Sequence, residues 1–338
     1  MKVIEKEINL KTTSPQSLLY LQEGTLLFDI ETTGFSPKTA RLYMIGAAHL
    51  EDEILHIHQF LTESKEDEVF LLIAFFNHCQ QYSSCVTYNG AGFDIPFLKE
   101  KASRYKLENV FPNLQVIDLY KELKPYKNLL KIMDLKQKTV EAFLGIERKD
   151  IFTGGELISH YLKFESNQSE EEEKLLLLHN YEDVLGMAYL LSIRSYLDAF
   201  SGKFAYEKGY TTISMDYYGQ DEERLVLETK LDTPVPVPIS YSKSCYYLTL
   251  RDDRLILSTQ VINNAIRVPY LDYKNYYYLK NEDIAILKSL AGHIDKSERE
   301  AATLETAYGK FQLSDEKLLS AKLFEPYIKT VIDLLCNI

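Results

Sequence analysis

The chain has 338 residues, 46% of them hydrophobic and 26% charged, which is typical of a soluble globular protein. This length exceeds what one compact core usually needs, so two domains are expected. No apolar run reaches the roughly 20 residues of a membrane-spanning helix, and no apolar segment follows Met1, so neither a membrane span nor a secretory signal is predicted. We therefore expect a cytoplasmic protein whose four scattered cysteines are reduced.

The formal net charge of −12 argues against a protein whose whole surface grips nucleic acid. It does not exclude a local binding groove, because a carboxylate-rich site holds cations that invert the local charge. Residues 121–138 are locally basic, and a solvated helix face is the simplest explanation of such a run. Beside a metal site the same lysines are candidates for phosphate contacts; they are Lys121, Lys124, Lys127, Lys131, Lys136 and Lys138.

Alternating apolar and polar residues predict several short β-strands in the first half of the chain. We expect them at 2–10, 26–30, 42–50, 53–60, 85–88 and 114–119. Helical spacing predicts a helix that ends near residue 76, capped by Ser64, and another that starts near Phe93. From there to Tyr196, apart from the last of these strands, the pattern is mainly helical.

Near residue 200 the pattern changes to short strands. We expect strands at 223–231 and 236–242, a hairpin formed by 246–250 and 255–259, and a helix from 282 to about 291 capped by Asn281. Tyrosines are dense in this half and fit either packing on a sheet, which we favour, or stacking on unpaired bases. They are Tyr241, Tyr246, Tyr247, Tyr270, Tyr273, Tyr276, Tyr277 and Tyr278.

The first candidate functional residues are Asp29 and Glu31, which lie two apart in a predicted strand. Residues i and i+2 of a strand point to the same side, so the two carboxylates face one way while Phe28 and Ile30 enter the core. Two adjacent acids repel each other unless a cation lies between them, and hard cations such as Mg²⁺ or Mn²⁺ prefer oxygen ligands. Taken alone, the pair is more often an ordinary solvent-facing feature.

Asp94 and Asp183 extend this set. Asp94 follows a glycine-containing turn, Tyr88-Asn89-Gly90-Ala91-Gly92-Phe93, where glycines let a substrate backbone approach closely. Asp94 could equally be a simple helix cap. His179 and Asp183 are four residues apart in a predicted helix and so share one face, which suits a metal ligand beside a titratable base.

These segments, FDIETTG at 28–34, YNGAGFD at 88–94 and HNYEDV at 179–184, together resemble the DEDD superfamily of RNase H-like exonucleases. More closely, they resemble the YprB-type RNase H-like domains, which are predicted 3′-to-5′ exonucleases. The resemblance covers about residues 21–200 and includes two further segments, Val116-Ile-Asp-Leu and Phe152-Thr-Gly-Gly-Glu-Leu.

The resemblance implies an α/β fold with an RNase H-like mixed five-stranded sheet flanked by helices over residues 1–200. A smaller α+β domain with an antiparallel sheet is expected over 201–338, where a protein partner or dimer contact is an open alternative. Two divalent cations, Mg²⁺ or Mn²⁺, would be held by Asp29, Glu31, Asp94 and Asp183. The substrate would be RNA or DNA with a free 3′ end.

The resemblance also implies roles for residues around the acids. Family members carry a Tyr four residues, or a His five residues, before the last Asp to orient or deprotonate the attacking water. His179 combines the histidine with the four-residue spacing and is expected in this role. Tyr181 lies roughly 200° around the helix from Asp183 and is a poor candidate for the base.

Contacts to substrate are expected from Thr32, Asn89 and Asn180. Asp118 is as well explained by bonding a loop as by a catalytic role. His56 and His58 would face one side of a strand, but no third ligand is evident, so an ordinary surface strand is expected rather than a metal site.

The leading hypothesis is therefore an active 3′-to-5′ exonuclease. The alternative is a catalytically weak or inactive RNase H-like protein that binds nucleic acid or a protein partner. An endonuclease that uses the same metals also remains open at this point.

Overall fold

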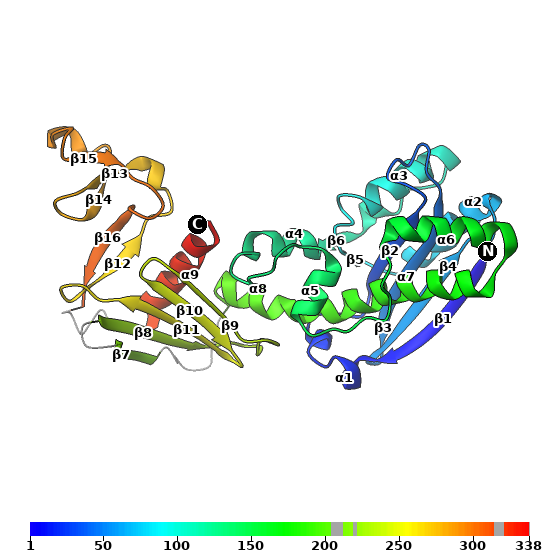
Figure 1. Ribbon diagram of the computed structural model, residues 1–338, viewed down its shortest axis with the longest axis horizontal. Helices are drawn as coiled ribbons and strands as arrows, with labels where there is room; N and C mark the ends of the chain where they lie inside the picture. Colours follow the sequence, from blue (N-terminus) through cyan, green and yellow to red (C-terminus); the bar gives the residue numbers. More distant parts are fainter. Residues whose placement is uncertain (204–211, 219–221, 314–320, 338) are drawn as a thin grey trace. The chain divides into compact units, whose positions relative to one another are not determined.

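The computed structural model describes residues 1–203, 212–218, 222–313 and 321–337 (Figure 1). The chain divides into two compact units, one of Met1–Lys124 with Ile132–Ser192 and the other of Pro125–Lys131 with Ile193–Ile338. Within the described ranges, every helix is too short or too polar to cross a membrane.

The first unit is built on a six-stranded mixed sheet with the strand order β1-β4-β3-β2-β5-β6. The strands are β1 (Lys2–Asn9), β2 (Thr25–Thr32), β3 (Leu42–Glu51), β4 (Ile54–Leu61), β5 (Ser84–Thr87) and β6 (Gln115–Asp118). β1 to β4 pair antiparallel, whereas β5 and β6 run parallel to β2. The expected fold class is confirmed, with one strand more than the expected five, and all six strands lie where alternation predicted them.

Helices cover both faces of this sheet (Figure 1). The α2 and α3 helices pack on one face around a core that includes Phe28, Ile30 and Phe75, while α6 and α7 lie over the other, around Tyr43 and Leu176. The helices of this unit are α1 (Leu10–Thr13), α2 (Glu68–Cys79), α3 (Asp94–Tyr105), α4 (Leu119–Leu123), α5 (Gln137–Phe143), α6 (Gly154–Asn167) and α7 (Glu170–Leu190). Because side chains alternate along β2, Asp29 and Glu31 face α7 while Phe28 and Ile30 face α2.

The second unit contains an antiparallel five-stranded sheet with the order β7-β8-β11-β10-β9. Its strands are β7 (Thr212–Tyr218), β8 (Glu222–Lys230), β9 (Ile239–Lys243), β10 (Tyr246–Arg251) and β11 (Arg254–Gln260). The predicted hairpin is confirmed as β10 and β11, with Leu248 paired to Leu257. The unit also has two smaller sheets and two helices, α8 (Arg194–Ser201) and α9 (Ala321–Asn337). One sheet pairs β12 (Ala265–Pro269) with β16 (Tyr308–Gln312), and the other has the order β14 (Ile284–Leu287), β13 (Tyr276–Leu279), β15 (Arg299–Ala301).

The expected helix over 282–291 is wrong, because this segment is part of a hairpin. β13 (Tyr276–Leu279) and β14 (Ile284–Leu287) pair around a turn in which Asp283 has a φ of 54°. The Asp283 carboxylate accepts hydrogen bonds from the hydroxyls of Tyr278, at 2.7 Å, and Tyr308. The first bond lies within the hairpin, and the second joins the turn to the sheet of β12 (Ala265–Pro269) and β16 (Tyr308–Gln312). Such a contact between distant segments is not visible in local helix signals.

Several tyrosines of this half pack against other protein groups, whereas Tyr247 is exposed. The Tyr246 ring is buried and its hydroxyl donates to the Arg267 carbonyl oxygen at 3.1 Å. The rings of Tyr270 and Tyr276 stack with their centroids 4.5 Å apart. The remaining strand of this unit, β15 (Arg299–Ala301), pairs with β13 and covers its outer edge.

Candidate metal-binding and catalytic site

Three elements bring the predicted acids together on the α7 face of the sheet. Asp29 and Glu31 lie near the end of the central strand β2, Asp94 opens α3, and Asp183 lies in α7. The Asp94 carboxylate accepts a hydrogen bond from the backbone N–H of Ile30 at 3.2 Å, so it is held directly beside the two strand acids. One carboxylate oxygen of Glu31, one of Asp183 and a His179 ring nitrogen lie within 4.8 Å of one another.

The turn that delivers Asp94 depends on Asn89 and Asp118. Asn89 has a φ of 62°, a left-handed conformation that asparagine tolerates better than most residues. Asp118 is buried and accepts hydrogen bonds from the backbone N–H groups of Asn89, at 3.0 Å, and Ala91, at 3.1 Å. The structure therefore favours the loop-bonding role of Asp118, which sets the path of the chain into α3.

His179 connects these acids to a second group of charges. Its Nε2 lies 3.0 Å from an Asp183 oxygen and 3.4 Å from a Glu31 oxygen, while its Nδ1 lies 2.7 Å from Asp150. The ring is only 4% exposed, and the Asp150 side chain is 1% exposed. A carboxylate on each side of a buried imidazole fixes the orientation of the ring toward the acids.

Arg148 and Asp150 are functional candidates that the sequence did not reveal. The Arg148 guanidinium contacts Asp183 at 2.6 Å, Glu141 at 3.1 Å and Asp150 at 3.4 Å, and its side chain is 8% exposed. Both residues lie between α5 and α6, in a segment without regular secondary structure. In the sequence, only their position just before the Phe152-Thr-Gly-Gly-Glu segment links them to the site. Their own segment has no helical or strand-like spacing that would indicate a role.

That segment forms the start of α6 and lies against the acids. Thr153 caps the helix, and Glu156 accepts hydrogen bonds from the backbone and hydroxyl of Thr153, both at 2.8 Å. A Cβ atom on Gly154 would lie 4.0 Å from a Glu31 oxygen, so the start of α6 lies beside this carboxylate.

The electrostatics of the acids call for a cation. Burial, together with the charges of Asp94, Asp183 and Glu31, raises the pKa of Asp29 well above its usual value. Burial also raises the pKa of Glu31 and that of Asp94, with the nearby acids adding to the effect in both. A bound divalent cation would stabilise the ionised form of these buried, mutually repelling carboxylates, and hard cations prefer such oxygen ligands.

The two basic residues act in the opposite direction on Asp183. Burial opposes its ionisation, but the hydrogen bond from His179 and the charges of His179 and Arg148 lower the pKa of Asp183. Burial likewise disfavours a charged imidazole, yet the hydrogen bond to Asp183 and the charges of Asp183, Glu31 and Asp150 raise the pKa of His179 to about 9. In this state His179 is an imidazolium that donates a proton toward the acids.

The donor set fits divalent cations of the Mg²⁺ or Mn²⁺ class. Oxygens of Glu31 and Asp183 lie within 4.8 Å of each other, and Asp94 bonds a backbone N–H beside them. The charges of these three acids all act on Asp29, so the site is rich in the carboxylate oxygens that these ions prefer. Since Arg148 and His179 each bond an oxygen of Asp183, a cation that binds Asp183 competes with both.

The three predicted substrate contacts have different surroundings. The Asn89 side chain is exposed beside the Asp94 turn, and Thr32 is half-buried at the end of β2 with its hydroxyl donating to the Gly34 carbonyl at 2.9 Å. Asn180 is fully buried and accepts a hydrogen bond from Gln59 at 3.1 Å. Because Asn180 faces the sheet, its side chain holds α7 on the sheet.

Of the basic stretch, Lys138 is the member that enters this network. Its ammonium lies 2.7 Å from the Asp150 carboxylate and also donates to the Phe152 carbonyl oxygen. Burial opposes the charge of Asp150, but the hydrogen bond from Lys138 and the charge of His179 lower the pKa of this carboxyl. Lys138 is thus paired with a carboxylate. It is neither an unpaired lysine on a solvated helix face nor a lysine free to contact a phosphate.

Comparisons with known proteins add the following. No curated protein sequence matches this chain. A family B DNA polymerase from the archaeon Pyrobaculum calidifontis is 13% identical, with a TM-score of 0.43, over 93% of this chain and 46% of the polymerase, so this chain spans less than half of that protein. An exonuclease I structure is 10% identical, with a TM-score of 0.35, over 94% of this chain and 71% of that protein.

Exonuclease I of E. coli in complex with a dT13 oligonucleotide is also 10% identical, with a TM-score of 0.33, over 93% of this chain and 74% of that protein. The family model of the RNase_H superfamily matches residues 26–194, which contain all four acids, His179, Arg148 and Asp150. That match spans half of the 338 residues, and the chain therefore belongs to the RNase H superfamily.

Proposed function

We propose that this protein is a divalent-metal-dependent nuclease that removes nucleotides from the 3′ ends of RNA or DNA. The observation that carries the proposal is the proximity of Asp29, Glu31, Asp94 and Asp183 on one face of the sheet in an RNase H superfamily fold. The action at 3′ ends comes from the resemblance of the three acidic segments to DEDD exonucleases.

The four carboxylates would hold the cations, Mg²⁺ or Mn²⁺. When bound, such cations lower the pKa of a coordinated water and stabilise negative charge on the phosphate and on the leaving oxygen. Asp29 and Glu31 contribute from a rigid central strand, and Asp94 is fixed by its bond to Ile30. Placement on regular elements keeps the ligands in position with little reorganisation.

His179 holds or moves a proton at Nε2, the nitrogen that faces Asp183 and Glu31. Asp150 accepts from Nδ1 and fixes both the orientation and the tautomer of the ring. The raised pKa of His179 depends on the negative charges of Asp183 and Glu31. With the charges of Asp183 and Glu31 neutralised by bound cations, the pKa of His179 would be lower. The ring would then keep the Nδ1 proton, whose hydrogen bond Asp150 accepts, and the free Nε2 could act as a base.

One observation favours the alternative of a nucleic-acid-binding protein with weak turnover. Arg148 forms a close salt bridge with Asp183, a predicted metal ligand, and is buried by its contacts with two further acids. If Arg148 holds Asp183 too firmly for a cation to displace it, the fold would bind nucleic acid without cleaving it.

The test uses single-stranded RNA and DNA labelled at the 5′ end, incubated with the protein and Mg²⁺ or Mn²⁺. We expect a ladder of products that shortens from the 3′ end and disappears with EDTA. Asp29→Asn and Asp94→Asn should abolish it, whereas Glu100→Gln, an exposed acid on the same helix as Asp94, should leave it unchanged.

Several outcomes would overturn the proposal. Equal cleavage by wild type and by the double variant Asp29→Ala/Glu31→Ala would place the activity elsewhere. Cleavage of a circular substrate at the same rate would indicate an endonuclease. Binding of oligonucleotides without any cleavage by the wild type in either metal would favour the alternative of an inactive binding protein.

A further inference from the structure

Three histidines gather on the face of the sheet opposite to the acids. His49 comes from β3, His58 from β4 and His78 from the end of α2. Along β3, His49 lies on the same side as Ala47 and Ile45, which pack with α2, whereas Gly46 faces α7. The histidine cluster is therefore separated from the predicted catalytic site by the sheet itself.

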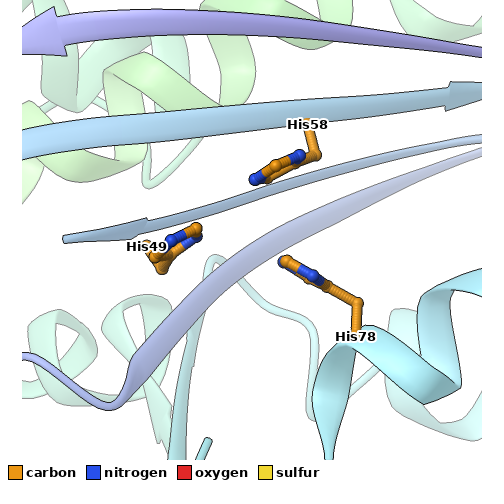
Figure 2. Close-up of side chains that lie close together, drawn as sticks. All are labelled: His49, His58 and His78. Atoms are coloured by element: carbon orange, nitrogen blue, oxygen red, sulfur yellow. The ribbon is translucent and has the colours of Figure 1, made fainter. Parts of the chain in front are cut away.

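The geometry of the cluster is that of a candidate metal site. One nitrogen of each ring lies within 4.8 Å of the other two. The ring centroids of His58 and His78 are 4.8 Å apart, and those of His49 and His78 are 5.7 Å apart. Figure 2 shows the rings of His58 and His78, one from a strand and one from a helix, both reaching toward His49.

Two of the nitrogens are buried without a hydrogen-bond partner among the residues that the structure describes. They are Nδ1 of His49 and Nε2 of His58. Leaving a buried polar atom unbonded costs about 1–3 kcal/mol, so two such atoms in one cluster require a reason. A third polar group is near, because the Tyr82 hydroxyl lies 3.4 Å from Nε2 of His78.

Glu5 adds a feature common to metal-binding histidines. A carboxylate oxygen of Glu5, on β1, lies 3.4 Å from Nδ1 of His58. Histidines that bind a metal through one nitrogen usually present the other to a carboxylate or carbonyl, which fixes the tautomer and orients the ring. Here that arrangement leaves Nε2 of His58, the unbonded atom, facing the other two histidines.

We propose that His49, His58 and His78 bind one transition-metal cation, with Zn²⁺ as the expected ion. Imidazole nitrogens suit Zn²⁺ and its neighbours in the transition series, whereas Mg²⁺ and Ca²⁺ prefer oxygen. Ligand nitrogens around a tetrahedral zinc with bonds of about 2.0–2.1 Å are roughly 3.3 Å apart. Rotations that draw the rings together by about 1.5 Å from the 4.8 Å limit therefore complete the site.

The three rings are half-buried. A neutral imidazole offers the lone pair that a metal binds. Three protein ligands leave a fourth position for water or for Tyr82, and the bound ion would tie β3, β4 and α2 to one another.

His56 provides a matched control. It lies on the same face of β4 and stacks on His49 with ring centroids 5.2 Å apart, yet its Nδ1 pairs with Glu7 at 3.4 Å and it is outside the cluster. The sequence shows His56 and His58 two residues apart on one strand, with no third ligand nearby. In the structure His58 lies beside His49 and His78 instead, which come from another strand and a helix.

The experiment titrates Zn²⁺ into the full chain, carrying no histidine tag and bearing Asp29→Asn and Asp183→Asn to weaken metal binding at the acids. Competition with a chromophoric chelator gives affinity and stoichiometry, and Co²⁺ in place of Zn²⁺ reports tetrahedral coordination by its visible spectrum. We expect one ion per chain. His58→Asn and His78→Gln should each weaken binding by about 10-fold or more, and His56→Asn should not change it.

Melting in EDTA shows whether each variant folds, and Zn²⁺ should raise the melting temperature of the parent chain but not that of His78→Gln. The proposal is overturned if the parent chain binds no Zn²⁺, or if His56→Asn and His58→Asn lose affinity equally. It is also overturned if folded His58→Asn and His78→Gln proteins bind as tightly as the parent. None of these readouts depends on nuclease activity.

Discussion

Gly46 is the position where a single methyl group should disturb the predicted catalytic site most directly. It pairs with Asp29 in the β2–β3 register and faces α7. A Cβ atom there would stand 2.4 Å from the Asn180 side-chain oxygen and 2.6 Å from a Val184 methyl, where ordinary contact begins at 3.4 Å. Asn180 is fully buried and bonded to Gln59, so neither neighbour can swing into open space.

We expect Gly46→Ala to move α7 away from the sheet by about 1 Å. Overpacking a filled core costs about 1–3 kcal/mol, and the gain of replacing a strand glycine by alanine recovers about 0.5–1 kcal/mol. With the midpoints of the two ranges, the net loss in the free energy of unfolding should be about 1.3 kcal/mol. Since α7 carries Asp183 and β2 carries Asp29, the same shift should weaken Mn²⁺ binding.

The assay is urea denaturation of wild type and variant, with Mn²⁺ titration of the folded proteins. Gly155→Ala is the control, because a Cβ on Gly155 in the first turn of α6 meets nothing within 4 Å. This control should be neutral or slightly stabilising. If Gly46→Ala unfolds at the same urea concentration as Gly155→Ala and binds Mn²⁺ normally, the described contact between β3 and α7 is wrong.

Three further outcomes follow from the charges. Asp150→Asn should lower the pKa of His179, measured by NMR titration, and reduce cleavage, whereas a merely structural Asp150 would leave that pKa unchanged. Arg148→Met should tighten Mn²⁺ binding in calorimetry because a competing cation leaves Asp183, while thermal stability falls because buried acids lose their partner. Finally, burial lowers the pKa of His78 in the folded state to about 4, so below about pH 6.5 the unfolded chain binds a proton that the folded chain does not. Metal-free protein should therefore lose stability as the pH falls from about 6.5 toward 4, and His78→Gln should lose less.

Those features of the site that depend on local geometry could be predicted from the sequence. The alternation of β2 placed Asp29 and Glu31 on one side and Phe28 on the other, and the structure has this arrangement. Helical spacing placed His179 and Asp183 on one face, and their side chains are 3.0 Å apart. Periods of two and 3.6 residues are properties of the backbone, so they survive in any tertiary context.

The residues that were missed or misassigned depend on contacts between distant segments. Arg148 contacts Asp183, 35 positions further along the sequence, from a segment without periodicity. No local pattern therefore predicts this contact. The partner of Asn180 could not be predicted either, because one residue along a helix turns a side chain by about 100° from that of His179. That rotation directs Asn180 toward Gln59 and the sheet.

β3 lies next to both proposed sites, because its Gly46 pairs with Asp29 and its His49 belongs to the histidine cluster. The alternation of side chains along β3 determines whether the two sites can affect each other. Gly46 and His49 are three residues apart, so they face opposite sides of the sheet and their backbones are about 10 Å apart. They share no side-chain partner: α7 covers Gly46, while His58 and His78 surround His49. In metal-free protein, the stability losses of Gly46→Ala and His49→Asn should therefore add to within about 0.5 kcal/mol in the double variant. A larger coupling energy in urea denaturation would mean that β3 moves as one body, and a metal at the histidines would then influence the acids through the strand.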